Sequence, residues 1–236
     1  MDMLLSLSSV TVARVWSGGF GEGGVGMGLM RASRWLVVSV AVVAVLVLPV
    51  GAHAEPPGVP SPGEARAMLG GLVVAAEGGA SGYSRQKFPH WSTTSGECTT
   101  RETVLRRDGS GVEVDALCRP TAGSWRSLYD DTTVTDPSKI DIDHVVPLAE
   151  AWRSGADTWS TEERERFAND LGHPQLVAVT AAVNRAKGDQ DPAQWLPPSL
   201  TYRCTYVRMW IAVKAVWRLS VQQAEKDALV EVLDGC

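Results

Sequence analysis

Two short segments, far apart in the chain, constrain its fold more than any other feature of the sequence. The first, Ile140–Pro147, alternates apolar and acidic residues before its proline, which is typical of a strand with two different faces. The second, Asn184–Asp189, lies on a predicted short helix that Thr180 caps and Gly188 ends. An apolar run over 175–179 predicts another strand directly before that helix. The fold must therefore bring two strands and a short helix together.

The polar residues of these two segments suit one kind of chemistry. Asp143 and His144 are neighbours on the first strand, so their side chains point to opposite sides and can serve different tasks. A neutral imidazole can deprotonate water near pH 7. A carboxylate and the amide oxygen of Asn184 are hard ligands, which favour Mg²⁺, Mn²⁺ or Ca²⁺ over Zn²⁺. Because a divalent cation stabilises both the attacked phosphate and the leaving oxygen, the residues suit metal-assisted phosphodiester hydrolysis.

The same two segments carry a resemblance to a known family. Asp143–Pro147 (Asp-His-Val-Val-Pro), followed by Asn184–Asp189 (Asn-Arg-Ala-Lys-Gly-Asp), resembles the ββα-metal site of HNH endonucleases. The branch it resembles most is the GmrSD-type restriction endonuclease C-terminal domain. The core of the match covers 140–197, and the layout over 83–236, with Phe88-Pro89-His90-Trp91, is similar to small secreted members. The resemblance implies an α+β fold: a ββα-metal (HNH) core flanked by helices and stapled by disulfides.

The resemblance also implies roles for individual residues. His144 would be the general base, and Asp143 and Asn184 would bind a divalent metal ion, Mg²⁺ or Mn²⁺. The substrate would be DNA, with RNA left open, and the products would carry 5′-phosphate and 3′-hydroxyl ends. The position that often holds a base-orienting asparagine falls by spacing on Gln175, a departure from the family pattern. Asn169 is a second candidate for that role.

Basic residues are the candidates for holding the phosphate backbone. They are Arg185, Lys187, Arg85 and Arg101. For Arg185 and Lys187 the alternative is a pair of solvated charges at a helix C-terminus. Further arginines before the motif, at 106, 107 and 126, make that region the candidate DNA-facing surface. Asp141 shares a strand face with Asp143 and is either a supporting acid or a strand-edge residue.

The beginning of the chain predicts export. An apolar run over 35–48 follows Arg31 and Arg34 and ends at Ala52-His53-Ala54, which is typical of a secretory signal peptide over 31–54. The alternative is a membrane anchor, because the uncharged stretch reaches ~18 residues. We favour cleavage after Ala54 and expect a secreted, extracellular protein with no membrane contact in its mature form. Residues 1–30 precede a complete signal peptide, so a start codon assigned too far upstream would explain them.

The remainder, 55–236, is large enough for one domain with its own core. We expect a leader and N-terminal helix over 55–82 and a single HNH nuclease-like domain over 83–236. The first 54 residues contain three basic and two acidic ones. The remainder therefore has 19 basic and 25 acidic residues, a net charge of about −6. That charge counts against a tight general binder of nucleic acid and favours a local basic face. The sequence indicates no obligate protein partner.

The cysteines predict covalent cross-links. All four lie after the predicted signal peptide, at Cys98, Cys118, Cys204 and Cys236. An even number in an exported chain favours two disulfides, and four cysteines allow three connectivities. We favour Cys98–Cys118 and Cys204–Cys236, because each pair brackets a compact segment. A zinc site is the weaker alternative, since no Cys-x-x-Cys spacing occurs.

Capping signals place most of the helices. Capping boxes at Ser61, Ser160 and Ser220 predict helices that reach about Val74, about Leu171 and Leu233. Residues 103–107 fit either a strand or a helix. An apolar stripe with helical spacing predicts a core helix; its residues are Tyr206, Trp210, Val213 and Trp217.

Two other functions remain open from the sequence. One is a non-catalytic extracellular binding module on a nuclease fold, which the intact Asp143, His144 and Asn184 argue against. The other is a secreted metal-dependent hydrolase that acts on another phosphoester or on a wall polymer.

Overall fold

The computed structural model describes residues 56–236; the predicted signal peptide over 31–54 and residues 1–30 lie outside the described residues. This part is a mixed α+β structure with three small antiparallel sheets. The α-helices are α1 (Pro62–Gly71), α2 (Thr100–Asp108), α3 (Leu148–Arg153), α4 (Thr161–Ala168), α5 (Ala181–Lys187), α6 (Arg203–Val216) and α7 (Gln223–Asp234). The strands are β1 (Thr93–Ser95), β2 (Cys98–Thr99), β3 (Gly109–Val114), β4 (Pro120–Ser127), β5 (Thr132–Val134), β6 (Ile140–His144) and β7 (Leu176–Thr180). Short 3-10 turns are η1 (Arg85–Lys87), η2 (Pro137–Lys139), η3 (Ala156–Thr158) and η4 (Leu200–Tyr202).

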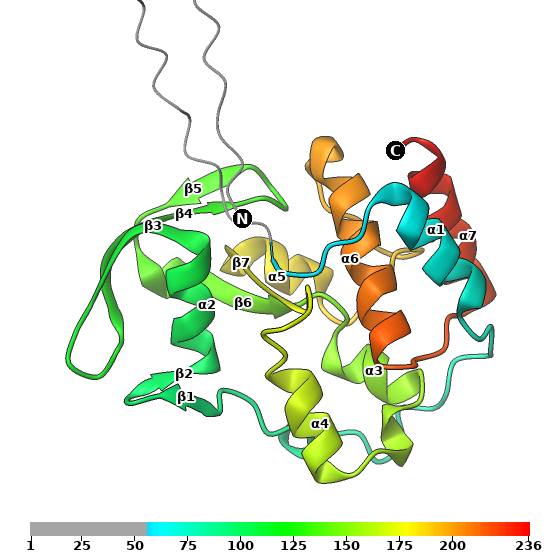
Figure 1. Cartoon of the computed structure of the whole chain (residues 1–236), viewed down its shortest axis with the longest axis horizontal. Helices are drawn as coiled ribbons and strands as arrows, with labels where there is room; N and C mark the ends of the chain where they lie inside the picture. The colour runs from blue at the N-terminus through cyan, green and yellow to red at the C-terminus, as the bar shows by residue number, and fades with distance from the viewer. Residues whose placement is uncertain (1–55) are drawn as a thin grey trace, which may run out of the picture. The chain divides into compact units, whose positions relative to one another are not determined.

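The antiparallel pair β6–β7 lies at the centre of the described residues. Ile140 pairs with Thr180 and His144 with Leu176, and α5, which follows β7 directly, contacts both strands. In Figure 1 the sheet β3–β4–β5 with α2 lies on one side of this pair, and α1, α6 and α7 lie on the other. The chain between β6 and β7 holds α3, η3 and α4. The predicted strands and short helix therefore come together in the order strand, strand, helix.

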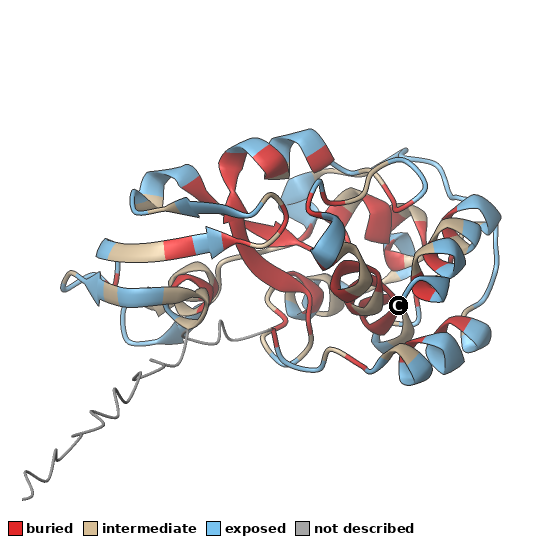
Figure 2. Ribbon diagram, turned by 90° about the horizontal axis from the view of Figure 1, so that it is seen from above, coloured by how far each residue is buried: buried red, intermediate tan, exposed pale blue. Residues whose placement is uncertain are grey.

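The central pair separates two hydrophobic cores, and Figure 2 shows buried residues where strands and helices meet. Leu176 and Ala178 face the smaller core with Ile140 and Ile142, while residues 177 and 179 face the larger, helical core. Because successive side chains of β7 enter different cores, the whole strand is buried. This explains why its sequence is a continuous apolar run rather than an alternating one.

The larger core is built around α6. The predicted stripe of Tyr206, Trp210 and Val213 is fully buried, and Trp217 packs against the same core. Lys214 is also fully buried, with its ammonium 2.8 Å from Glu150 Oε1 and 2.7 Å from Glu225 Oε1. This buried ionic cluster joins α6 to α3 and α7.

Several predicted boundaries need correction. Helix α2 resolves the ambiguity over 103–107 in favour of a helix, because Thr99 and Glu102 form a capping box. Helix α7 begins at Gln223 behind a capping box at Gln222, not Ser220, whose hydroxyl donates to the Ser154 carbonyl. Helix α1 ends before Val74 because residues 73–75 pair with Val221.

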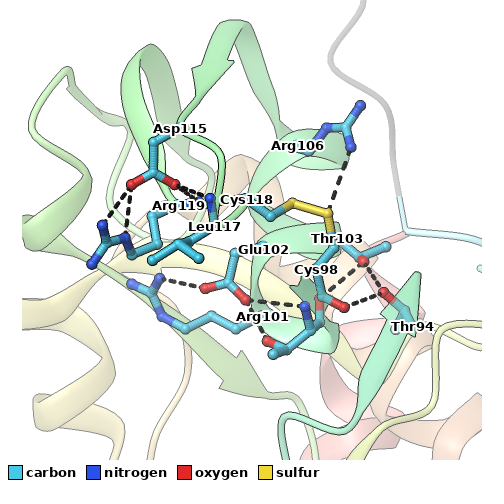
Figure 3. Close-up of a disulfide and its surroundings, with 11 residues drawn as sticks. Thr94, Cys98, Arg101, Glu102, Thr103, Arg106, Asp115, Leu117, Cys118 and Arg119 are labelled. Atoms are coloured by element: carbon cyan, nitrogen blue, oxygen red, sulfur yellow. Dashed lines mark hydrogen bonds and ion pairs between the residues drawn. A yellow bond between two sulfur atoms is a disulfide. The ribbon is translucent and has the colours of Figure 1, made fainter. Parts of the chain in front are cut away.

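Both predicted disulfides are confirmed. Cys98–Cys118 ties β2 to the loop between β3 and β4, with Arg106 beside the Cys98 sulfur (Figure 3). Cys204–Cys236 ties the first turn of α6 to the second residue after α7. No cysteine between residues 56 and 236 is left free.

Candidate functional site

A pocket of about 280 Å³ opens beside the end of β6. It brings together five of the predicted site residues, which come from η1, β6 and α5: Arg85, Asp143, His144, Asn184 and Arg185. The other residues of its lining are Tyr83, Ile142, Pro147, Leu148, Ala149, Gly188 and Asp189. Segments separated by up to a hundred residues of sequence therefore converge on the Asp-His end of one strand.

Asp143 lies on the face of β6 that meets the helical core. Its side chain is buried, with Oδ1 accepting from Lys187 Nζ at 2.8 Å and Oδ2 from the Tyr129 hydroxyl at 2.8 Å. Burial raises the pKa of the Asp143 carboxyl, and the charge and hydrogen bond of Lys187 oppose that rise. Lys187 is itself fully buried and also donates to the His144 carbonyl at 2.8 Å. It stands behind Asp143 and not among the residues that line the pocket.

His144 is held in one tautomer by a main-chain carbonyl. Its Nε2 lies 2.9 Å from the carbonyl oxygen of Ala168, the last residue of α4. Since a carbonyl can only accept, Nε2 carries the proton and Nδ1 keeps the lone pair. Burial lowers the pKa of His144 to about 3, and the positive charge of Arg85 acts in the same direction. The ring is therefore neutral at pH 7, as a general base must be.

The indole of Trp91 covers the imidazole of His144. The two ring centroids are 5.7 Å apart and the planes are tilted by 31°. The backbone of Trp91 has φ +65°, a left-handed conformation that costs a non-glycine residue ~1–2 kcal/mol. Asn169 fixes both flanks of this residue, because it donates to the Pro89 carbonyl and accepts from the Ser92 amide. The strained backbone thus places an aromatic cover on the candidate base.

Asn184 and Asp141 are joined by a hydrogen bond. Asn184 Nδ2 donates to Asp141 Oδ2 at 3.2 Å. This hydrogen bond fixes the orientation of the amide and leaves Oδ1 as the atom of Asn184, at the pocket, that could bind a metal ion. Asp141 and Asp143 share one face of β6. Asp141 therefore supports the orientation of the predicted ligand Asn184.

The predicted phosphate-binding arginines fall into two groups. The guanidinium groups of Arg85 and Arg185 line the pocket, are exposed, and form no hydrogen bond or ion pair with any residue in 56–236. Arg101 instead donates to the Ile140 carbonyl at 3.3 Å, at the start of β6. Two further arginines of the expected basic surface are also engaged: Arg107 pairs with Asp108, and Arg126 with Asp131. Of the predicted phosphate-binding arginines, the two with unpaired guanidinium groups are therefore the two that line the pocket.

Neither candidate for orienting the base contacts His144. The Gln175 amide accepts from the Val146 nitrogen at 3.0 Å and donates to the Val146 carbonyl at 2.9 Å. It holds the main chain two residues after the histidine. Asn169 acts on Trp91 through residues 89 and 92, as described above. The ring is oriented instead by the Ala168 carbonyl, for which the sequence carries no signal.

The donor set fits a divalent cation with few protein ligands. No group of three or more His, Cys, Asp or Glu side chains within the described part of the chain is arranged to hold a metal. Mg²⁺ commonly keeps several waters and is bound by one or two carboxylates together with substrate phosphate. Asp143 and Asn184 line one pocket and would contribute a carboxylate, whose two oxygens already accept from Lys187 and Tyr129, and an amide oxygen. Asp141 lies behind Asn184. This set suits Mg²⁺ or Mn²⁺ rather than a closed zinc site.

Comparison with known proteins places the chain in a family. Residues 113–232 match the family described as GmrSD restriction endonucleases, C-terminal domain, and the chain belongs to this family. A relative from Arthroderma benhamiae (strain ATCC MYA-4681 / CBS 112371), described as an uncharacterized secreted protein, is 59% identical over 181 residues. The alignment covers 77% of this chain and 89% of the relative. No solved structure matches the chain.

These comparisons confirm two expectations from the sequence. The resemblance to the GmrSD-type family holds, although the match begins at residue 113 and leaves Arg85 and Trp91 outside it. The expected secretion agrees with the description of the relative. Within residues 56–236, no helix combines the length and apolar character needed to span a bilayer.

Proposed function

We propose that this protein is a secreted, metal-dependent HNH-type endonuclease that hydrolyses the phosphodiester bonds of DNA. The observation that carries the proposal is His144, kept neutral with its lone pair on Nδ1, in one pocket with Asp143, Asn184 and two unpaired arginines. The arrangement of β6, β7 and α5 supports a ββα-metal core, since α5 contacts both strands and brings Asn184 to the end of β6.

His144 supplies the proton acceptor. Nδ1 takes a proton from the attacking water while Nε2 keeps its hydrogen bond to Ala168, so the ring does not rotate during the transfer. The resulting imidazolium lies in a buried position near Arg85, where its charge is unfavourable. The transfer of the proton to Nδ1 is therefore uphill, and the imidazolium releases the proton readily to water after each turnover.

The other residues hold the phosphate and the ligands. The guanidinium groups of Arg85 and Arg185 are free to donate to the non-bridging oxygens of the scissile phosphate. A divalent cation held by Asp143 and Asn184 would stabilise the charge of the phosphate and of the leaving oxygen. Lys187 and Tyr129 fix the rotamer of Asp143, and Asp141 fixes the amide of Asn184.

A plasmid-nicking assay with Mg²⁺, Mn²⁺ or EDTA tests the proposal. Wild type should nick DNA with metal and not with EDTA, and His144→Ala should lose ~10²-fold or more of the rate. His173→Ala is the matched control, because this histidine pairs with Asp170 away from the pocket. Equal rates for wild type and His144→Ala would refute the mechanism. If no nucleic acid is cut but a small phosphodiester is, the function is that of a different phosphoester hydrolase.

A further inference from the structure

A second pocket adjoins the candidate site across Arg185. Its volume is about 470 Å³, and Arg185 is the residue that lines both pockets. The remaining lining comes from the end of β5, from η2, from the end of β7 and from the start of α5: Val134, Ser138, Lys139, Thr180, Ala181 and Ala182. Neither the family match nor the sequence motifs assign a role to this pocket.

The free hydrogen-bonding groups of this second pocket are cationic. The ammonium group of Lys139 and the guanidinium group of Arg185 are exposed and form no hydrogen bond or ion pair with any described residue. The two hydroxyls are already engaged, since Ser138 donates to Asp136 at 2.7 Å and Thr180 donates to Asp130 at 2.6 Å. No carboxylate is among the lining residues. The ligand that fits two free cations in this setting is an anion.

Lys139 is positioned so that it can bind a second phosphate of a substrate whose first phosphate lies in the candidate site. Lys139 directly precedes β6, so its main chain lies four strand residues before Asp143, about 13 Å away at ~3.3 Å per residue. One strand of duplex DNA advances ~3.4 Å per nucleotide. A chain bound at Asp143 can therefore reach Lys139 with another of its phosphates.

We infer that the second pocket is a phosphate subsite, in which Lys139 and Arg185 bind a phosphate of the substrate strand other than the one that is cleaved. The inference rests on the proposed nuclease function. It makes the substrate class a polynucleotide chain rather than a mononucleotide or a small diester. Arg185, between the two pockets, contacts both phosphates, and Lys139 contacts only the outer one.

Two substrates of different length test this subsite. One is a single-stranded DNA oligonucleotide and the other is bis(4-nitrophenyl) phosphate, which has a single diester. Lys139→Gln should lower kcat/KM about tenfold on the oligonucleotide, as for loss of a charged hydrogen bond, and leave the small diester unchanged. Arg185→Gln should lower both. Lys226→Gln on α7, which lines neither pocket, is the matched control.

Oligonucleotide binding in EDTA gives a second readout that does not depend on catalysis. Lys139→Gln should reduce the slope of log K against log salt by ~0.7, the value for one phosphate contact on a single strand. The subsite is refuted if Lys139→Gln matches Lys226→Gln in both assays, or if it impairs both substrates equally. If wild type cuts neither substrate, the nuclease function is refuted. If wild type and Lys139→Gln then also bind the oligonucleotide equally, the subsite is refuted as well.

Discussion

At the scale of single residues, two neighbours on one strand occupy very different surroundings. Asp143 points toward the helical core, where Lys187 and Tyr129 hold its carboxylate. His144 points to the other side, against Trp91 and the Ala168 carbonyl. Strand alternation in the sequence predicted this division between the two residues. Their partners were not predictable, because they come from segments whose proximity only the fold creates.

The neutral, buried state of His144 predicts acid sensitivity. An unfolded histidine has a pKa of ~6.5, whereas burial lowers the pKa of His144 to about 3. Between these values the unfolded chain binds the additional proton, so the free energy of unfolding falls as the pH falls, by at most ~1.4 kcal/mol per pH unit from this group. Urea unfolding at several pH values should show a weaker acid dependence for His144→Asn than for wild type. Identical dependence in the two proteins would contradict the prediction, and His173→Asn serves as the control.

The buried Lys187–Asp143 pair predicts that removing the lysine alone destabilises the fold more than removing both charges. Lys187→Met should lower the free energy of unfolding by ~3–5 kcal/mol, because it leaves the Asp143 carboxylate buried without its cation. Asp143→Asn combined with Lys187→Met should recover part of that loss, since the remaining group is uncharged. Lys226→Met, at a half-buried position of α7 where the lysine forms no ion pair with a described residue, should change stability little. If the single and double variants are equally unstable, Lys187 does not act through the charge of Asp143.

At the scale of elements, local signals predicted helix starts better than helix ends. Capping boxes at Ser61 and Ser160 begin α1 and α4 as expected. The starting point of α7 was wrong because tertiary contact with Ser154 takes the hydroxyl of Ser220. Contacts of this kind join residues distant in sequence, and no local pattern encodes them.

Asn169, at the end of α4, ties three segments together and predicts a measurable loss when truncated. Its amide bonds the Pro89 carbonyl, the Ser92 nitrogen and the Thr100 hydroxyl. Asn169→Ala should therefore cost ~1–3 kcal/mol in urea unfolding, because partly buried groups lose their partners. It should also slow DNA cleavage, since residues 89–92 carry the cover over His144. Gln190→Ala, which removes a more exposed amide, is the comparison; an Asn169 variant as stable as this one would contradict the prediction.

At the scale of the whole molecule, two disulfides hold opposite ends of the described structure. Cys98–Cys118 closes a separation of 20 residues and Cys204–Cys236 one of 32. The chain-entropy relation gives ~3.3 kcal/mol for the first and ~3.7 kcal/mol for the second. In urea unfolding without reductant, Cys204→Ser/Cys236→Ser should therefore lose slightly more stability than Cys98→Ser/Cys118→Ser. A larger loss for Cys98→Ser/Cys118→Ser would show that native-state contacts outweigh loop length.

The distribution of charge predicts how DNA binding responds to salt. The chain is acidic overall, and three free cations line the two pockets: Arg85, Arg185 and Lys139. Two neutralised phosphates, the cleaved one and the one in the second pocket, give a slope of about −1.4 in log K against log salt for a single strand. Binding measured in EDTA over a range of salt concentrations tests this value. A much steeper slope would indicate that a different, more extensive basic face meets the nucleic acid.

The sequence predicted which residues meet at the pocket more fully than it predicted the contacts that hold them there. Asp143, His144 and Asn184 could be selected because their residue types and spacing have a chemical meaning. The buried position of Lys187 could not, since a lysine on a short helix is more often exposed. Gln175 shows the same limit: its spacing suggested that it orients His144, but its amide binds the Val146 main chain in the folded protein.

The hydrogen bond from His144 to Ala168 has a consequence for how this protein can vary. A side chain that orients a catalytic base can be lost by a single codon change, but a main-chain carbonyl remains whatever residue occupies the position. Substitutions at 168 that fit the closed space there and keep α4 helical leave the bond in place. Mutation can therefore change the residue at position 168 without removing the hydrogen bond that orients the proposed base, and a comparison of aligned residue types would not detect the carbonyl group that forms it.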